Sequence, residues 1–357
     1  MKYIEPGILR IFLLFPFLHP IFCFIKSLLA SKIGMETEDN LQNSLAITII
    51  QHIGLILHII PEIISRIRQK RENLDIIERS IDKDKFIFSN LNFFDFKVIG
   101  LIFISNIFNF YPEMLELYIK NNEKIYFYLD RFLLIFFTAI ESYFILNIQI
   151  FIHQYLAMII IFISTLFIII FGKCYDEFQF IETVFQILTT IFVSLSIVID
   201  KIILEVYFIS PFMILFLQGV FGLIIDFFLL FIFVKIDLIS MEQFFYFFQN
   251  VNIFIIIFYS LFFCFTLTFV LLTSFYFGPT MVCVSDFISA FALDIMIELK
   301  WYKIIGYIIL IIGCFIYNEI IILNFFGLNK FTQKEIILRS QIEIKFEDNE
   351  SSSEENN

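Results

Sequence analysis

Long apolar stretches recur along this chain at a length that suits membrane-spanning helices. Crossing about 30 Å of hydrocarbon takes roughly 20 mainly apolar residues in a helix, and a helix satisfies its backbone hydrogen bonds without water. Short polar breaks separate ten such stretches. The expected helices are 8–29, 43–65, 97–119, 127–147, 150–172, 179–199, 211–234, 244–268, 273–296 and 302–325. The predicted fold class is therefore all-α, a polytopic integral membrane protein with ten transmembrane helices.

Composition and residue types exclude several other classes of protein. Hydrophobic residues make up 60% of the chain and its mean hydropathy is +0.89, well above the level of a soluble domain. The first stretch differs from a signal peptide, because no small-residue cleavage site follows it and Lys26 lies inside it. Scattered cysteines and histidines show no metal-ligand spacing, and no phosphate-binding loop or nucleophile–base pair is present. We therefore expect no cofactor, no metal, no nucleic-acid partner and no enzymatic activity.

A basic segment sets the expected orientation in the membrane. The loop 66–96 after the second helix carries a run of basic residues: Arg66, Arg68, Lys70, Arg71, Arg79, Lys83 and Lys85. By the positive-inside rule this loop is cytosolic, which places the N-terminus in the cytosol. An even number of helices returns the C-terminus to the same side. Much of the net charge of −11 lies in residues 347–355 of the tail 326–357, whose polar, acidic composition predicts disorder.

Acidic residues at membrane depth are the main functional signal. Asp286 and Asp294 interrupt the apolar stretch 273–296, and Glu141 interrupts 127–147. Ionisable groups inside a bilayer are costly unless they face a cavity or a partner, so they mark transport pathways. The alternative for Asp286 is a bond to a neighbouring helix, and Asp294 and Glu141 lie close enough to helix ends to reach the interface.

The two halves of the chain show a weak internal repeat. Glu141 precedes a short break and a helix with Ala157 and Ser164, and Asp294 precedes a break and a helix with Gly306 and Gly313. Five helices per half is an odd number, so the halves 1–172 and 173–325 have opposite orientations in the membrane. Inverted-repeat transporters bind substrate near the midplane, where the halves meet. Glu141 and Asp294 are then expected to face one cavity.

Other ionisable residues are weaker candidates. Arg131 faces either substrate or Asp130 and a lipid headgroup, and Asp200 and Lys201 are expected near the membrane interface. Asp226 and Glu62 are isolated acids in apolar runs, and the sequence does not identify their partners. His52 and His58 are six residues apart, which puts them on different faces of a helix.

Four segments resemble the solute carrier 35 family of the drug/metabolite transporter superfamily (EamA-like proteins), and within it subfamily F with its F6-like members. These segments are Leu129-Asp-Arg131 with 137–142, Val198-Ile-Asp-Lys201 with Gln218-Gly-Val-Phe-Gly222, Gly278-Pro-Thr280 with Asp286, and Gly306 to Asn318-Glu319. The resemblance covers residues 97–320, most closely 190–320. It implies a ten-helix fold, cytosolic termini and movement of a small organic solute across an endomembrane of the Golgi, ER, lysosome or vacuole.

The chain departs from the family pattern in the charges of the expected cavity. Val282 and Ser289 stand where relatives tend to carry basic residues, Gln218 stands where an acid is usual, and Glu141 and Asp294 stand at positions expected to be apolar. Arginine and lysine are the usual ligands of phosphate groups, and only Arg131 and Lys201 remain. The sequence thus favours a cationic or neutral solute, or coupling to protons through a carboxylate, over a standard nucleotide sugar.

We therefore predict a secondary transporter that works by alternating access, with protons, a small solute and the lipid bilayer as its partners. The predicted site residues are Asp286, Asp294, Glu141, Arg131 and Lys201. One alternative is an antiporter that exchanges a nucleotide sugar for a nucleoside monophosphate. Another is a non-transporting structural or receptor-like membrane protein. The sequence leaves the oligomeric state open, a homodimer included.

Overall fold

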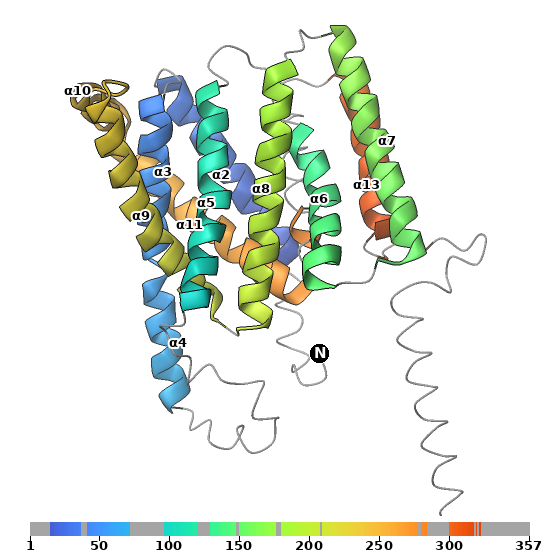
Figure 1. The fold of residues 1–357 in the computed structure, drawn as a ribbon, viewed down its shortest axis with the longest axis horizontal. Helices are drawn as coiled ribbons and strands as arrows, with labels where there is room; N and C mark the ends of the chain where they lie inside the picture. Colours follow the sequence, from blue (N-terminus) through green and yellow to red (C-terminus); the bar gives the residue numbers. More distant parts are fainter. Residues whose placement is uncertain are drawn as a thin grey trace, which may run out of the picture. The chain divides into compact units, whose positions relative to one another are not determined.

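The computed structural model describes residues 15–36, 41–71, 96–119, 129–147, 150–175, 180–207, 209–277, 280–283, 300–317, 319 and 321–322. This part of the chain is helical and contains no strand (Figure 1). Its helices are α2 (Phe15–Glu36), α3 (Leu41–Ile56), α4 (Ile59–Arg71), α5 (Phe96–Ile119), α6 (Leu129–Leu146), α7 (Ile152–Tyr175), α8 (Phe180–Glu205), α9 (Pro211–Lys235), α10 (Met241–Asn250), α11 (Ile253–Phe277) and α13 (Trp301–Tyr317).

The described helices are those of a membrane protein. Four segments are long and apolar enough to cross a bilayer: Asn43–Ser65, Ile187–Glu205, Pro211–Lys235 and Ile253–Phe275. Helices α5, α6, α7 and α9 begin and end within three residues of the predicted bounds. The first helix is shifted from the predicted 8–29 to Phe15–Glu36, and most of the predicted helix 273–296 lies outside the described residues.

Two predicted helices are interrupted, each for a local reason. The helix expected over 43–65 breaks at Leu57 and His58, because Pro61 has no N–H and its ring clashes with the carbonyl four residues earlier. The prediction of one continuous helix over 244–268 is wrong. The structure has two helices there, because α10 ends at Asn250 and α11 starts at Ile253. Asn252 caps α11, its side-chain oxygen accepting a hydrogen bond of 2.9 Å from the Phe254 N–H.

The packing of the helices divides the chain into two units. Unit 1 comprises Met1–Leu146 and Phe178–Leu299, and unit 2 comprises Asn147–Glu177 and Lys300–Asn357. In unit 1, α6 and α5 pack along α8, α2 packs along α11, and α3 packs along α9. Shorter contacts join α3 to α11 and α5, and α9 to α5 and α11. In unit 2, α7 packs along α13.

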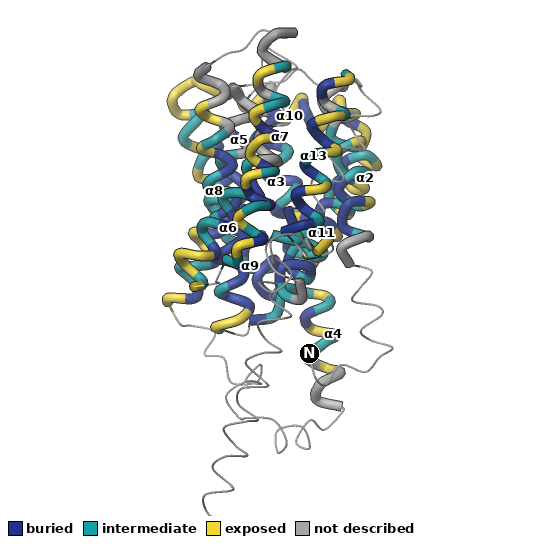
Figure 2. The backbone as a smooth tube through the Cα atoms, turned by 90° about the vertical axis from the view of Figure 1, so that its right-hand side faces the viewer, coloured by how far each residue is buried: buried dark blue, intermediate teal, exposed yellow. Residues whose placement is uncertain are grey.

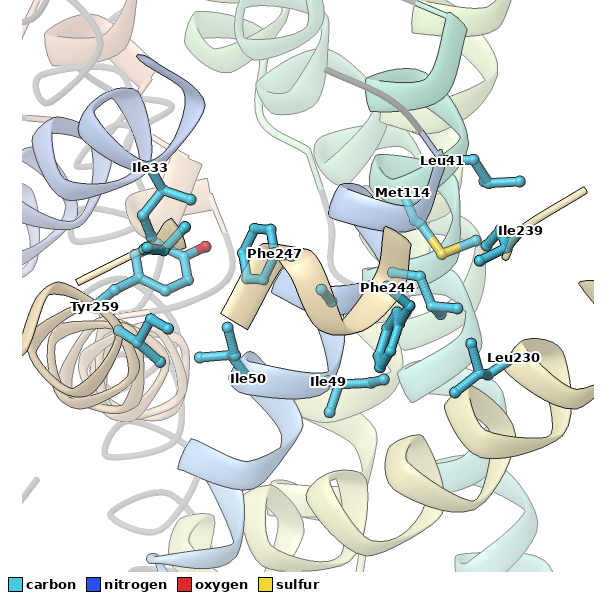
Figure 3. Packing of buried hydrophobic residues seen from close by; sticks show 14 residues of the cluster. Ile33, Leu41, Ile49, Ile50, Met114, Leu230, Ile239, Phe244, Phe247 and Tyr259 are labelled. Atoms are coloured by element: carbon cyan, nitrogen blue, oxygen red, sulfur yellow. The ribbon is translucent and has the colours of Figure 1, made fainter. Parts of the chain in front are cut away.

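Two apolar clusters form the core of unit 1. The α10 cluster joins Phe244 and Phe247 to residues of α2, α3, α5, α9 and α11, such as Ile33 and Tyr259 (Figure 3). The central cluster lies among α3, α5, α8, α9 and α11. Its fully buried members include Leu55, Ile102, Ile203 and Ile214.

Helix α9 shows why the outer faces of these helices suit lipid. Its outward residues Ile224, Phe228 and Phe231 are 63%, 62% and 67% exposed, whereas Gln218 and Asp226 on its inner face are 1% and 0% exposed. Figure 2 shows the same alternation of buried and exposed residues along the other helices. A hydrocarbon solvent favours this arrangement, in which apolar groups lie outside and polar groups lie inside.

Unit 2 is held by close contact between small residues. A Cβ added to Gly306 would lie 2.3 Å from the Ile168 side chain, and one added to Gly313 would lie 2.8 Å from Ile161 and 3.4 Å from the Ala157 carbonyl. The Ser164 hydroxyl donates a hydrogen bond of 2.6 Å to the Gly306 carbonyl. The small residues noted in the sequence therefore let the backbones of α7 and α13 approach each other.

Candidate functional site

A buried histidine–aspartate pair joins α3 to α9. Nδ1 of His52 lies 2.6 Å from Oδ2 of Asp226, and both side chains are completely buried. The hydroxyl of Tyr111 on α5 donates a hydrogen bond of 3.0 Å to the other carboxylate oxygen, Oδ1. We call His52, Asp226 and Tyr111 the histidine–aspartate cluster. Because an ionised carboxylate only accepts hydrogen bonds, Nδ1 of His52 is the donor in this pair.

Glycines on α9 make this contact geometrically possible. A Cβ on Gly222 would lie 2.2 Å from the His52 ring, and one on Gly219 would lie 2.9 Å from the His52 carbonyl oxygen. The ring of Phe110 packs on the other side, its centroid 4.3 Å from that of His52. The imidazole is therefore fixed between α5 and α9, and its Nε2 has no hydrogen-bond partner among the described residues.

A second buried carboxylate, Asp200 on α8, is held by neutral donors. The hydroxyl of Ser105 on α5 donates a hydrogen bond of 2.6 Å to Oδ1 of Asp200. The side-chain amide of Gln218 on α9 lies 3.2 Å from the same oxygen. Gln218 stands where the family pattern has an acid, and as an amide it donates to Asp200 where an acid would repel it.

Lys201, one of the predicted site residues, binds the end of a neighbouring helix. Its ammonium donates hydrogen bonds of 2.7 Å and 3.0 Å to the carbonyl oxygens of Ser274 and Phe275 on α11. It also lies 2.7 Å from the Glu205 carboxylate. The last carbonyls of a helix have no partner within the helix, and a cation there is favourable. Lys201 therefore closes the C-terminal end of α11.

Glu141, another predicted site residue, lies half-buried on α6. Its carboxylate forms a hydrogen bond with Ser194 on α8, and its Oε2 has no partner among the described residues. Of the two isolated acids, Asp226 has the partners described above. Glu62 on α4 accepts a hydrogen bond of 2.5 Å from the Ser210 hydroxyl.

The structure thus places only part of the predicted site. Asp286 and Asp294 lie outside the described residues. The backbone of Arg131 lies in the first turn of α6, while its side chain is outside the described part. Glu141 bonds Ser194, whereas Lys201 bonds α11 and Glu205, so these contacts do not join the two residues. The side chains of Asp200 and Lys201 are buried, 7% and 5% exposed, and their expected position near the membrane interface stays a prediction.

Sequence reasoning missed His52 and Tyr111. The sequence places His52 and His58 on different faces of a helix and identifies no partner for His52, because Asp226 is 174 positions away. One signal was available on α9. Gln218, Gly222 and Asp226 recur every four residues in an otherwise apolar helix, which puts two polar groups and one small residue on the same face.

The charge balance of the described core limits what it can bind. Its buried carboxylates include Glu62, Asp200 and Asp226, whereas the one buried lysine of the described residues, Lys201, is occupied by α11 and Glu205. In the described part of the chain, no three histidine, cysteine, aspartate or glutamate side chains come together to hold a metal ion. The described core thus favours cations and neutral polar groups over phosphates.

The chain matches no protein-family model, and no curated protein matches it. The likeness to the solute carrier 35 family therefore stays a prediction, carried by the motifs quoted above.

Proposed function

We propose that this chain is a secondary transporter that moves a small organic solute by alternating access, coupled to protons through membrane-buried carboxylates. In this proposal ten helices form two inverted repeats, 1–172 and 173–325. The observation that carries the proposal is the symmetric pairing of the described helices. Symmetric halves around buried ionisable groups are the usual construction of secondary transporters.

Most of the helix contacts recur when the two halves are exchanged, although the α8–α11 contact has no counterpart between α2 and α5 among the main contacts. The exchange replaces α2, α3, α5 and α7 by α8, α9, α11 and α13. The α2–α11 contact then becomes α8–α5, the α3–α11 contact becomes α9–α5, and the α3–α5 contact becomes α9–α11. All six of these contacts, the original three and their three counterparts, are observed. It also turns α3–α9 and α7–α13 into themselves. A twofold repeat pairs a helix near its axis with its own counterpart, as α3 and α9 are paired within unit 1.

Side chains follow the same exchange. Gly54 is followed four residues later by His58, and Gly222 is followed four residues later by Asp226. On α11, the Cys264 thiol donates to the Gly54 carbonyl and the Thr268 hydroxyl lies 2.7 Å from Nε2 of His58. On α5, the Tyr111 hydroxyl lies 3.3 Å from the Gly222 carbonyl and 3.0 Å from Asp226. Each half thus presents a glycine and an ionisable group to the third helix of the other half.

The contacts also support opposite orientations for the repeats. His52 of α3 meets Asp226 of α9, whereas Glu62, ten positions after His52, meets Ser210 at the start of α9. The segment containing α3 and α4 is therefore antiparallel to α9. In an inverted repeat, corresponding helices have this relation.

We assign the proton to the histidine–aspartate cluster. The pair joins the two self-paired helices α3 and α9, about which the halves would rock. It is completely buried, and α9 packs closely against His52 at Gly219 and Gly222. Carboxylates in apolar surroundings can exchange protons near neutral pH.

The test is solute uptake into proteoliposomes that contain the purified full chain, with and without an imposed pH gradient. The panel sets cationic and neutral metabolites beside nucleotide sugars exchanged against nucleoside monophosphates. We expect uptake of a cationic or neutral solute to depend on the gradient. Asp226→Asn should reduce gradient-driven uptake at least tenfold, and Glu242→Gln, an exposed acid on α10, should leave it unchanged.

The other outcomes select the alternatives. Nucleotide-sugar exchange that ignores the pH gradient would indicate the antiporter, with Arg131 as the remaining candidate for the phosphates. No saturable uptake of any class, together with an Asp226→Asn variant that is only less stable, would indicate a structural or receptor-like membrane protein.

A further inference from the structure

A group of buried polar side chains separate from the histidine–aspartate cluster lies where α5, α8 and α11 meet. Both amide atoms of Asn106, the hydroxyl of Thr273 and the hydroxyl of Ser274 have no hydrogen-bond partner among the described residues. These side chains are 0%, 0% and 1% exposed. Unpaired buried polar groups are costly, and native proteins have few of them. Such groups on α5 and α11, the helices that bond Asp200 and Lys201 of α8, point to a polar ligand.

Hydrogen bonds to α8 relate Asn106 and Ser274 to two consecutive residues, Asp200 and Lys201. Ser105, which precedes Asn106, donates its hydrogen bond to Asp200. Lys201, which follows Asp200, donates to the Ser274 carbonyl. Asn106 of α5 and Ser274 of α11 therefore flank the same two residues of α8.

Helical spacing directs the unpaired groups toward the central cluster. Asn106 lies four residues after Ile102 and four before Phe110, and both belong to this cluster. Ser274 lies three residues after Leu271, another member. Residues three or four apart share one face of a helix. The amide of Asn106 and the hydroxyl of Ser274 thus lie on the helix faces that pack into the central cluster, which includes Phe110 and Phe263.

The negative charge of the buried Asp200 carboxylate favours a bound cation. Asp200 is buried and is bonded by the neutral groups of Ser105 and Gln218. The positive charge of Lys201 is already paired with Glu205. A buried carboxylate with neutral partners is stabilised by an opposite charge, either a proton or a bound cation.

We infer that Asp200, Asn106 and Ser274 form the solute site, and that the solute is a small organic amine with an apolar body. The ammonium group binds the Asp200 carboxylate, polar groups of the solute bond Asn106 and Ser274, and the apolar body packs on the phenylalanine rings. This inference rests on the proposed transport function, because it names the place where the transported solute binds.

The test is equilibrium binding to the purified full chain in lipid nanodiscs with two matched probes. Tyramine carries an ammonium group, and tyrosol has a neutral hydroxyl in the same place on an otherwise identical body. We expect tyramine to bind at least tenfold more tightly than tyrosol. Asp200→Asn should weaken tyramine binding at least tenfold, and Glu242→Gln should leave it unchanged.

Asn106→Leu separates a binding role from a structural one. If Asn106 serves a ligand, leucine should weaken tyramine binding severalfold and raise the unfolding temperature of the ligand-free protein, because it removes an unpaired buried amide. Thr165→Val is the control, since the Thr165 hydroxyl bonds the Ile161 carbonyl of its own helix in unit 2. It should not change tyramine binding.

Equal affinity for the two probes, no binding of either probe, or full affinity in Asp200→Asn would overturn the inference. If Asp200→Asn does not fold, unchanged tyramine affinity in Asn106→Leu would overturn it instead. Uptake of a neutral solute without tyramine binding would refute this site and leave the transport function standing. Tyramine binding without uptake of any solute would refute the transport function and leave the site.

Discussion

Asp226 and Lys201 show how a buried charge is accommodated by its neighbours. Asp226 is fully enclosed but has His52 and Tyr111 as partners, so its carboxylate keeps two hydrogen bonds inside an apolar helix. Lys201 is enclosed by backbone carbonyls and Glu205. Glycine matters equally here, because Gly222 is the residue that leaves room for the imidazole.

At the residue scale we predict that Gly222→Ala destabilises the protein. The new Cβ would lie 2.2 Å from the His52 ring, so α3 and α9 must separate or the ring must move. Overpacking of this kind costs about 1–3 kcal/mol, which thermal unfolding of the detergent-solubilised protein would detect. Gly100→Ala is the matched control, because its added Cβ meets nothing within 4 Å. Equal unfolding temperatures for the two variants would contradict the packing argument.

At the scale of the helices, single residues at the helix ends determine where each helix begins and ends and how it contacts its neighbour. Pro61 interrupts the long helix expected after the first one, and Asn252 starts α11 where a continuous helix from 244 was expected. Lys201 closes the other end of α11 from the neighbouring α8. The contact between α8 and α11 therefore depends on a single ammonium group as well as on apolar packing.

At this scale Lys201→Met is predicted to lower the stability of the fold. Methionine fills the space of the lysine stem but leaves the Ser274 and Phe275 carbonyls without their donor, a loss of about 1–3 kcal/mol. Thermal unfolding would measure it, with Lys235→Met at the exposed end of α9 as the control. An unchanged unfolding temperature combined with weaker solute uptake would instead assign Lys201 to the substrate, as the sequence alone suggested.

For the whole molecule, the antiparallel relation of α3 and α9 has consequences on both sides of the membrane. Glu62, in the first turn of α4, is bonded to Ser210, so the start of α4 and the start of α9 lie on one side. Residues after α9 lie on the other side if α9 crosses the bilayer, as its length and hydropathy permit. The basic residues of loop 66–96 predict that the first side is cytosolic.

A labelling experiment tests this topology. In a background without the native cysteines, Arg68→Cys and Val206→Cys should react with a membrane-impermeant maleimide from the cytosolic side of sealed vesicles. Leu238→Cys, exposed beyond the end of α9, should react only from the opposite side. Labelling of all three positions from one side would contradict the inverted arrangement of the repeats.

Local chemistry explains which features could be predicted. The apolar stretches determined that the chain is a helical membrane protein, and bounds such as those of α5 and α9 followed from where polar residues begin. The small residues Ser164, Gly306 and Gly313 entered the sequence analysis as part of a weak repeat, and the structure places them in the close contact of α7 and α13 within unit 2. These features depend on each segment's own sequence and on the solvent around it.

Only the tertiary structure decided which polar groups meet. His52 and Asp226, or Ser105 and Asp200, are ordinary isolated residues in the sequence and become partners because α3, α5, α8 and α9 pack side by side. A helix specifies which face a side chain occupies, but the neighbour of that face is set by how the apolar surfaces and glycines of all the helices fit together. The sequence therefore determined what kind of molecule this is, and the packing of its helices determined where the buried charges are paired.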